Sequence, residues 1–301
     1  MVGMGKIARD QHVPALAGNG AFELVAAASP HRRLDGVPNF TSIEALLEGV
    51  QNLDAVALCT PPQFRYSLAR AALEGGLHVL LEKPPGATLN EVAALVELAG
   101  KKGVALFATW HSREAAAVAP ARRWLEDRKV SRVTVTWKED VRVWHPGQAW
   151  IWKAGGLGVF DPGINALSIL TRILPGTLVL KDAELAVPSN CETPIAATLR
   201  LENGLGADVR VELDFLQTGP PRWDIDVETN TERLLLSKGG SVLQVGNAAP
   251  IENPDNEYPN LYARFEQLVR DRNIDVDVAP FRLVADAFMC GRRTVAEPFV
   301  E

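Results

Sequence analysis

The chain has 301 residues, 47% of them hydrophobic and 23% charged, which is typical of a globular protein with one large or two ordinary domains. Its formal net charge of −6 provides no basic field, so neither a nucleic acid nor an anionic membrane is expected as a partner. With only three cysteines, no apolar run of membrane-spanning length and no signal-peptide pattern, the sequence predicts a cytoplasmic protein without disulfides.

A glycine-rich turn opens the chain. Residues 3–8 read Gly-Met-Gly-Lys-Ile-Ala, which fits the pattern G-x-G-x-x-A, and helical spacing continues after them. Glycines at the first two positions let the backbone turn sharply and approach a pyrophosphate, which then lies on the helix N-terminus. The turn therefore predicts a dinucleotide site that includes Gly3, Gly5, Lys6 and Ile7.

The strand that should precede such a turn is nearly absent, since only Met1 and Val2 come before Gly3. That strand is central in a dinucleotide-binding sheet, and each buried apolar side chain contributes roughly 1.5–3 kcal/mol. We therefore expect the native chain to start some residues upstream of Met1. An intact mass of the native protein that matched residue 1 onward would contradict this expectation.

Apolar strands alternate with helices through the rest of the first third. Four continuous apolar runs predict buried strands: 22–29, 53–59, 77–81 and 104–108. Three segments with helical spacing lie between them: 42–47, 64–74 and 89–101. Strands without polar alternation, separated by helices, indicate a parallel sheet covered on both faces. We therefore predict a Rossmann-type α/β domain over residues 1–112.

The end of the second strand selects the cofactor in such folds. An acidic residue there binds the ribose 2′-hydroxyl of NAD, whereas an arginine accommodates the 2′-phosphate of NADP. Here Ser29 is followed by Pro-His-Arg-Arg, and no carboxylate comes before Asp35. The segment predicts an NADP site with Ser29 and Arg32, with NAD as the weaker alternative. The other interpretation is a loop whose charges are only solvated.

Two further motifs carry a family resemblance. One strand is followed by Glu-Lys-Pro at residues 82–84, and the strand before it by Thr-Pro-Pro at residues 60–62. With the glycine turn, they resemble the glucose–fructose oxidoreductase, inositol dehydrogenase and MocA family. The resemblance implies that Lys83 lies beside both the nicotinamide and the substrate. It also implies cofactor contacts from Thr60, Pro61, Glu82 and Lys83.

The alternation of strands and helices stops after Ala108. Seven runs, several with alternating apolar and polar residues, predict strands: 133–140, 178–187, 195–202, 206–215, 222–228, 232–237 and 241–245. Helices are predicted at 115–127, 165–174, 262–269 and 281–293. We therefore predict an α+β domain with a large, mostly antiparallel sheet over residues 113–301.

Residues 137–165 of this half interleave four tryptophans with acids and a histidine. Flat apolar faces beside fixed donors and acceptors suit a polyhydroxy ligand, whose C–H face stacks on an indole while its hydroxyls form hydrogen bonds. A packed, tryptophan-rich hinge is the alternative interpretation. We expect substrate contacts from His111, Glu139, His145, Trp152 and Trp223.

The family's second signature, D-x-x-x-H, appears as Asp161-Pro-Gly-Ile-Asn165, so that Asn165 stands where the family has histidine. Side chains four apart lie on one face of a helix. We expect Lys83 to be the general acid/base, Asp161 to orient it or to be the rival base, and Asn165 to bind a substrate hydroxyl. A helix cap followed by a polar helix face is the alternative. Arg65 is a second departure, because many relatives have a histidine there.

The resemblance narrows over residues 137–168, where Trp-His-Pro-Gly-Gln and Gly-Leu-Gly-Val-Phe-Asp-Pro-Gly-Ile-Asn look like segments of bacterial L-arabinose and D-galactose 1-dehydrogenases. It implies NAD(P)-dependent oxidation of an aldose at C1 to the lactone, with a small sugar as the partner. An anomeric hydroxyl is more acidic than an ordinary alcohol. A modest base therefore suffices, and the loss of the family's histidine is tolerable.

Two other functions remain open. A non-catalytic sugar or nucleotide sensor would share the fold, and another family oxidoreductase would act on a cyclic polyol or a dihydrodiol. Retention of Lys83 and Asp161 argues against the sensor. No metal site is expected, because neither His111 nor His145 has ligand spacing to another histidine or a cysteine. The resemblance also implies a homo-oligomer formed through the outer face of the antiparallel sheet.

Overall fold

The computed structural model describes residues 1–301, which divide into two compact units. Unit 1 comprises residues 1–110 and 258–278, and unit 2 comprises residues 111–257 and 279–301. Residues 258–278 therefore belong to unit 1, whereas the sequence division at residue 112 placed them in the second domain. The physical reason is that helix α8 (Glu257–Asp271) buries its apolar residues in a core of unit 1, which no local pattern reveals.

Unit 1 is built on a parallel sheet. Its strands follow the order β14-β5-β4-β3, with bounds Ile274–Asp275, Leu106–Ala108, His78–Leu81 and Ala55–Leu58. Val2 forms parallel bridges to Leu58 on one side and to Ala28 on the other, so it joins this sheet to the pair β1 (Ala27–Ala28) and β2 (Asn39–Phe40). The strand predicted over 22–29 is limited to β1, because only β2 and Val2 pair with it.

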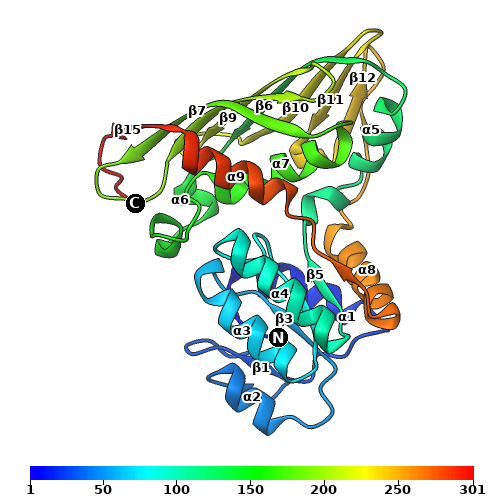
Figure 1. Cartoon of the computed structure of the whole chain (residues 1–301), viewed down its shortest axis with the longest axis vertical. Coiled ribbons are helices and arrows are strands. Elements are labelled where there is room, and N and C mark those ends of the chain that lie inside the picture. The colour runs from blue at the N-terminus through cyan, green and yellow to red at the C-terminus, as the bar shows by residue number, and fades with distance from the viewer. The chain divides into compact units, whose positions relative to one another are not determined.

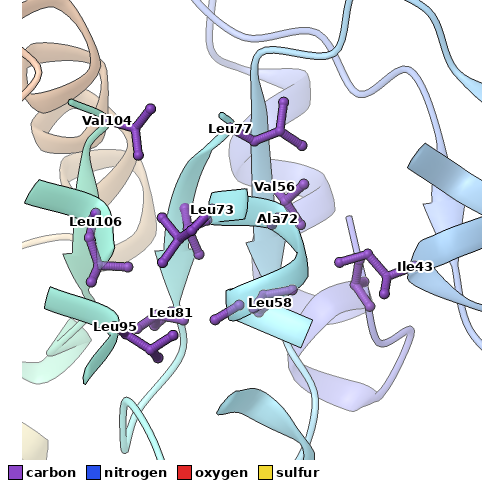
Figure 2. Packing of buried hydrophobic residues seen from close by; sticks show 14 of the residues in the cluster. Ile43, Val56, Leu58, Ala72, Leu73, Leu77, Leu81, Leu95, Val104 and Leu106 are labelled. Carbon is purple, nitrogen blue, oxygen red and sulfur yellow. The ribbon is translucent and has the colours of Figure 1, made fainter. Parts of the chain in front are cut away.

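Each face of this sheet has its own hydrophobic core. On one face, Leu81 packs in a cluster with helices α2 (Ile43–Gly49), α3 (Pro62–Glu74) and α4 (Leu89–Lys102), as Figure 2 shows. On the other face, the neighbouring Leu80 packs with α8 and with the helix formed by η1 (Ala8–His12) and α1 (Val13–Ala17). Burial on both faces explains why these strands consist of continuous apolar runs.

Capping residues define the ends of α4. Thr88 and Glu91 form a reciprocal capping box at its start, and Gly103 ends it in the left-handed region at a φ of 65°. These groups satisfy backbone donors and acceptors that the helix itself leaves unpaired. The polypeptide that leaves β4 is thereby fixed a few residues after Lys83.

Unit 2 contains a nine-stranded sheet with its helices along one face (Figure 1). The strands follow the order β13-β12-β11-β10-β6-β9-β8-β7-β15, with bounds Ile251–Glu252, Val242–Val245, Arg233–Ser237, Arg222–Thr229, Val130–Lys138, Asp208–Asp214, Ala196–Asn203, Leu178–Pro188 and Arg292–Ala296. Only the pairs β6–β9 and β7–β15 are parallel. The predicted fold class, a Rossmann-type sheet plus a large, mostly antiparallel sheet, is confirmed.

Helix α7 (Phe160–Ile173) lies against this sheet and packs with α5 (Val118–Leu125) and α9 (Ala279–Cys290), as Figure 1 shows. Gly163 brings α7 close to the sheet, because a Cβ at this position would lie 2.5 Å from Leu213 Cδ1. This close approach fixes the first turn of α7, which carries Asp161. No helix of the protein has the length and apolar composition needed to cross a membrane.

Candidate functional site

The glycine turn is shaped differently at its two glycines. Gly3 has a φ of 89°, and a Cβ on it would lie 2.8 Å from the backbone nitrogen of Thr60, so only glycine fits. At Gly5, by contrast, a Cβ would meet nothing within 4 Å. The first glycine therefore packs the turn on the neighbouring strand end, while the second leaves its backbone open to a ligand.

A hydroxyl beside this turn supports the fit of a dinucleotide. The Thr60 Oγ1 atom is buried and has no hydrogen-bond partner in the protein. Buried polar groups are rarely left unpaired. With the open backbone at Gly5 and the helix N-terminus at Lys6 and Ile7, Thr60 offers the groups that a pyrophosphate or ribose would use. The residues present therefore fit the predicted cofactor, whose chemistry would be hydride exchange at the nicotinamide.

The loop after β1 presents a free cationic group. Arg32 is exposed and forms no ion pair, and the backbone carbonyl of the next residue, Arg33, accepts a 2.8 Å hydrogen bond from the Arg9 guanidinium. The backbone nitrogen of Ser29 donates to Phe40 O at 2.9 Å. The loop is therefore held by its backbone, which leaves the Arg32 guanidinium available to a phosphate.

The segment that carries Lys83 is held by its backbone on both sides. The Arg65 side chain is only 2% exposed, and its guanidinium donates to the carbonyl oxygens of Thr60, Glu82 and Pro84. Lys83 itself is half-buried. Arg65, which departs from the family pattern, thus joins the two motifs that follow β3 and β4. No local sequence pattern indicates this contact.

Glu82, which was predicted to contact the cofactor, has its carboxylate bonded within unit 1. Its carboxylate is 3% exposed and accepts hydrogen bonds from three groups of unit 1: His12 Nε2 at 3.0 Å, the Tyr258 hydroxyl at 2.9 Å and the backbone nitrogen of Lys83 at 2.9 Å. These bonds direct the carboxylate into the interior of the unit. One of these bonds ties the carboxylate to the backbone of Lys83.

In unit 2, a buried carboxylate organises the tryptophan-rich stretch. The backbone nitrogen of Glu139 bonds to Asp214 O, which continues the pairing of β6 with β9 beyond the strand end. Glu139 Oε1 lies 2.9 Å from His145 Nε2, and Oε2 accepts a 2.8 Å bond from the Trp223 indole nitrogen. One carboxylate thereby fixes the orientation of two predicted substrate-binding side chains.

The imidazole of His145 lies between two carboxylates. With Nε2 bonded to Glu139, its Nδ1 lies 3.8 Å from Asp161 Oδ2. Asp161 is buried in the first turn of α7, and Asn165 follows one turn later on the same helix. The Asn165 side chain is half-buried and forms no hydrogen bond within the protein. The structure thus groups Glu139, His145, Asp161 and Trp223, with Asn165 one helical turn from Asp161.

The indoles of this region have different environments. Trp137 is buried on β6 and packs 6.3 Å from Trp223, so it is a core residue. Trp144, 40% exposed, meets Trp223 edge-on at 4.8 Å. Trp152, half-buried in the short helix η3 (Ala149–Trp152), contacts Phe215, which itself lies 5.5 Å from the His145 ring. Trp144, Trp152 and Trp223 are therefore exposed enough to meet a ligand, as is the half-buried Trp150.

Sequence reasoning missed the C-terminal tail. The Phe299 ring lies 4.8 Å from Trp152 and beneath the Arg142 guanidinium, and its backbone forms two hydrogen bonds with the Asn190 amide. The tail supports the tryptophan-rich stretch from a sequence distance of about 150 residues, so no local signal could have shown it. His111, also predicted to contact substrate, pairs with Glu257 at 2.5 Å. No group of His, Cys, Asp and Glu side chains is arranged to hold a metal ion.

Comparison with known proteins agrees with this architecture. The glycine turn and the parallel sheet define unit 1 as a dinucleotide-binding domain, and the model of an oxidoreductase family with an NAD-binding Rossmann fold matches residues 1–109. A galactose 1-dehydrogenase from Pseudomonas fluorescens is 46% identical over 301 residues, spanning 100% of this chain and 98% of the relative. The chain therefore belongs to this family, that of glucose–fructose oxidoreductase, inositol dehydrogenase and MocA.

Solved structures extend the comparison. The crystal structure of a D-galactose-1-dehydrogenase protein from Rhizobium etli has 52% sequence identity and a TM-score of 0.95, and the match covers 99% of this chain and 96% of that chain. A 3-ketoreductase from Actinomadura kijaniata, in complex with NADP and TDP-benzene, has 18% identity and a TM-score of 0.86, with 98% of each chain covered. The first match extends the likeness over both units, and the second shows the shared fold alone.

Proposed function

We propose that this chain is an NAD(P)-dependent aldose 1-dehydrogenase that oxidises D-galactose, L-arabinose or a similar sugar at C1 to its lactone. The observation that carries the proposal is the arrangement of Glu139, His145 and Asp161 beside partly exposed indoles. Such a surface suits a sugar, since it combines oriented polar groups with flat apolar faces. The full-length likeness to two galactose 1-dehydrogenases supports it.

The reaction breaks the C1–H bond and the anomeric O–H bond and forms the lactone carbonyl. A bound nicotinamide would supply the acceptor for the hydride that leaves C1. Lys83 Nζ takes the hydroxyl proton as the general base. Asp161 and Asn165 hold the reacting hydroxyl and its neighbour, because both lie on the first turns of α7. The indoles of Trp152 and Trp223 cover the C–H face and exclude water.

D-galactose and L-arabinose have the same ring stereochemistry and differ only at the exocyclic hydroxymethyl group. Hydrogen bonds to their shared hydroxyls would accept both, so discrimination through the extra group is limited to about 1–3 kcal/mol. The test is a panel of both sugars, an inositol and a dihydrodiol, each with NAD and NADP, followed by reduced-nicotinamide absorbance. Lactone formation from either sugar supports the proposal. Cofactor binding without turnover of any substrate would instead indicate a sensor.

We also propose that NADP is the preferred cofactor, because Arg32 is exposed, cationic and without an ion-pair partner. A guanidinium bound to phosphate contributes about 1.5–3 kcal/mol, so Arg32→Ser should raise the KM for NADP by about 10- to 100-fold and leave the KM for NAD unchanged. Steady-state kinetics with both cofactors measure this. Arg122→Ser on α5 is the matched control. An equal specificity constant for NAD in the unmodified protein would refute the preference.

Glu139 offers a second prediction. Glutamine has the same shape, but its single carbonyl oxygen can accept from only one of His145 Nε2 and Trp223 Nε1 in the present geometry. Since a hydrogen bond to a charged group contributes about 1.5–3 kcal/mol, Glu139→Gln should lower kcat/KM for the sugar by about 10- to 100-fold. The Kd of the cofactor should stay unchanged, which fluorescence titration measures. Glu212→Gln, on the same sheet but paired with Lys138, serves as the control.

We also propose that the protein works in the cytoplasm and associates with itself. The three cysteines are all free, as expected for a chain that works in the cytoplasm. The outer face of the sheet in unit 2 carries Arg200, Glu202, Arg210 and Glu212, all on neighbouring strands. We keep self-association through this face as an expectation, and light scattering at several protein concentrations would measure it.

A further inference from the structure

Unit 1 contains a group of polar side chains that the proposed reaction does not use directly. His12 is fully buried, and Glu82, Tyr258 and Tyr262 are 2–4% exposed. His12 contributes Nε2 to Glu82 Oε1 at 3.0 Å and Nδ1 to the Tyr262 hydroxyl at 2.8 Å, while the Tyr258 hydroxyl donates to the same Oε1 at 2.9 Å. These groups come from η1, the end of β4 and α8, and they form one connected network.

The network holds a charged pair. Burial alone would lower the pKa of His12, but Cys59, Glu82 and Tyr262 outweigh burial and hold that pKa well above its ordinary value of 6.5. Burial raises the pKa of Tyr262 to about 12, so this hydroxyl stays protonated. This shift favours the protonated imidazolium, in which both ring nitrogens donate. Its partner is the Glu82 carboxylate, which immediately precedes Lys83.

A buried ion pair is a poor means of adding stability. The desolvation of two charges offsets much of their attraction, and apolar residues of similar volume are often equally stable. The contact between His12 and Glu82 instead fixes the orientation of the Glu82 carboxylate. Glu82 Oε1 lies 3.0 Å from His12 Nε2 and accepts a hydrogen bond from the Tyr258 hydroxyl. The other carboxylate oxygen, Oε2, accepts a 2.9 Å hydrogen bond from the backbone N–H of Lys83. The orientation of the Lys83 backbone is thus set by the carboxylate.

The helix that carries His12 has an unusual form. It winds as a π-helix over Ala8–His12, directly after the glycine turn, and single π turns are frequent at functional sites. His12 is the last residue of that turn. From the other side of the segment, Arg65 holds the carbonyl oxygens of Glu82 and Pro84. The backbone around Lys83 is therefore held by side chains from two separate helices.

We infer that His12 and Tyr258 are positioning residues that act through Glu82 on Lys83. This inference rests on the proposed function only in taking Lys83 as the acid/base. The network links the helix that would bind the pyrophosphate to the residue that moves the proton, and α8 joins it through Tyr258. A lysine displaced by about 1 Å can lose about 100-fold in rate, so the network governs kcat rather than substrate affinity.

The kinetic test compares Tyr258→Phe with Tyr262→Phe. Both remove one hydroxyl from α8, but only Tyr258 donates to Glu82. Tyr258→Phe should lower kcat for the sugar by about 10-fold or more, with KM for the sugar and Kd for the cofactor within about twofold. Tyr262→Phe should lower kcat by a smaller factor. Combined with Lys83→Met, Tyr258→Phe should cause no further loss, because it acts through Lys83. Losses that multiply, or an equal loss from Tyr262→Phe, would overturn the inference.

A second measurement does not depend on turnover. Pro84 and Pro85 have no amide hydrogen, so hydrogen exchange of a peptide spanning residues 80–87 reports few amides, that of Lys83 among them. His12→Gln and Tyr258→Phe should speed exchange of this peptide, whereas Tyr262→Phe should change it less. Unchanged exchange in all three variants would refute the inference. If the unmodified protein oxidises no sugar, the proposed function fails, while this exchange result still decides whether the network holds Lys83.

Discussion

Lys83→Met is expected to lower kcat/KM for the sugar by about 10²- to 10⁴-fold, which is the usual contribution of general acid/base catalysis. The methionine side chain has nearly the same length and keeps the packing of a half-buried position, but it cannot carry a proton. The Kd of the cofactor should change little, because Lys83 adds no phosphate contact in this scheme. Stopped-flow measurement of a single turnover separates the chemical step from product release.

Two control experiments test whether the loss of activity is specific to the Lys83 amine. Lys101→Met alters an exposed lysine of α4 that pairs with Glu97, and it should leave kcat unchanged. Lys83→Ala should regain part of its activity when propylamine is added, since the free amine supplies the missing base. A Lys83→Met variant with kcat within about threefold of the unmodified protein would remove Lys83 from the reaction. The base would then have to be Asp161.

The strands of unit 1 were predictable from sequence because their burial on both faces produces unbroken apolar runs. The runs at 53–59, 77–81 and 104–108 correspond to β3, β4 and β5. What could not be predicted is the return of α8 and β14 to this sheet. Ile274 and Asp275 pair with Leu106 and Phe107 across more than 160 residues, and the apolar face of α8 would suit either domain.

The candidate site, too, could be predicted from sequence only in part. Motif spacing marked Lys83 and Asp161, and the dense alternation of indoles and acids marked Glu139 and His145, because these signals are local. The partners that hold them are not local. His12 and Phe299 each contact a segment far away in the chain, whereas Arg65 lies 17 residues from Glu82, and none has a neighbouring pattern that predicts its contact. Local sequence patterns therefore marked the candidate reactive groups but not the distant side chains that hold them.

The replacement at Asn165 acquires a physical explanation from the structure. In the family signature, the histidine lies on the same helix as the aspartate, four residues later. Here an imidazole approaches Asp161 from a different element, since His145 follows the short helix α6 (Val141–Trp144) and places Nδ1 3.8 Å from Asp161 Oδ2. Glu139 fixes the opposite nitrogen of that ring. At the helix position where the family has histidine, this chain has the half-buried amide of Asn165. An amide there suits a hydrogen bond to a sugar hydroxyl.

Asp161→Asn tests whether this carboxylate takes part in proton transfer. The amide has the same size and keeps the close packing of α7 on Leu213, but it removes the negative charge beside His145. We expect kcat to fall by about 100-fold or more, because both roles proposed for Asp161, orientation and proton transfer, need the carboxylate. The Kd of the cofactor should be unaffected. Asp286→Asn, an exposed position on α9, is the matched control.

A double variant separates the two roles left open for Asp161. If the carboxylate acts by orienting Lys83 or the substrate, Asp161→Asn should cost little in a Lys83→Met background, since the group that it serves is gone. If it is itself a base, the two losses should multiply. His145→Asn should reproduce part of the Asp161→Asn loss in kcat, because the imidazole faces the same carboxylate. Near-normal kcat in Asp161→Asn would remove Asp161 from catalysis and leave Lys83 as the sole candidate for the proton.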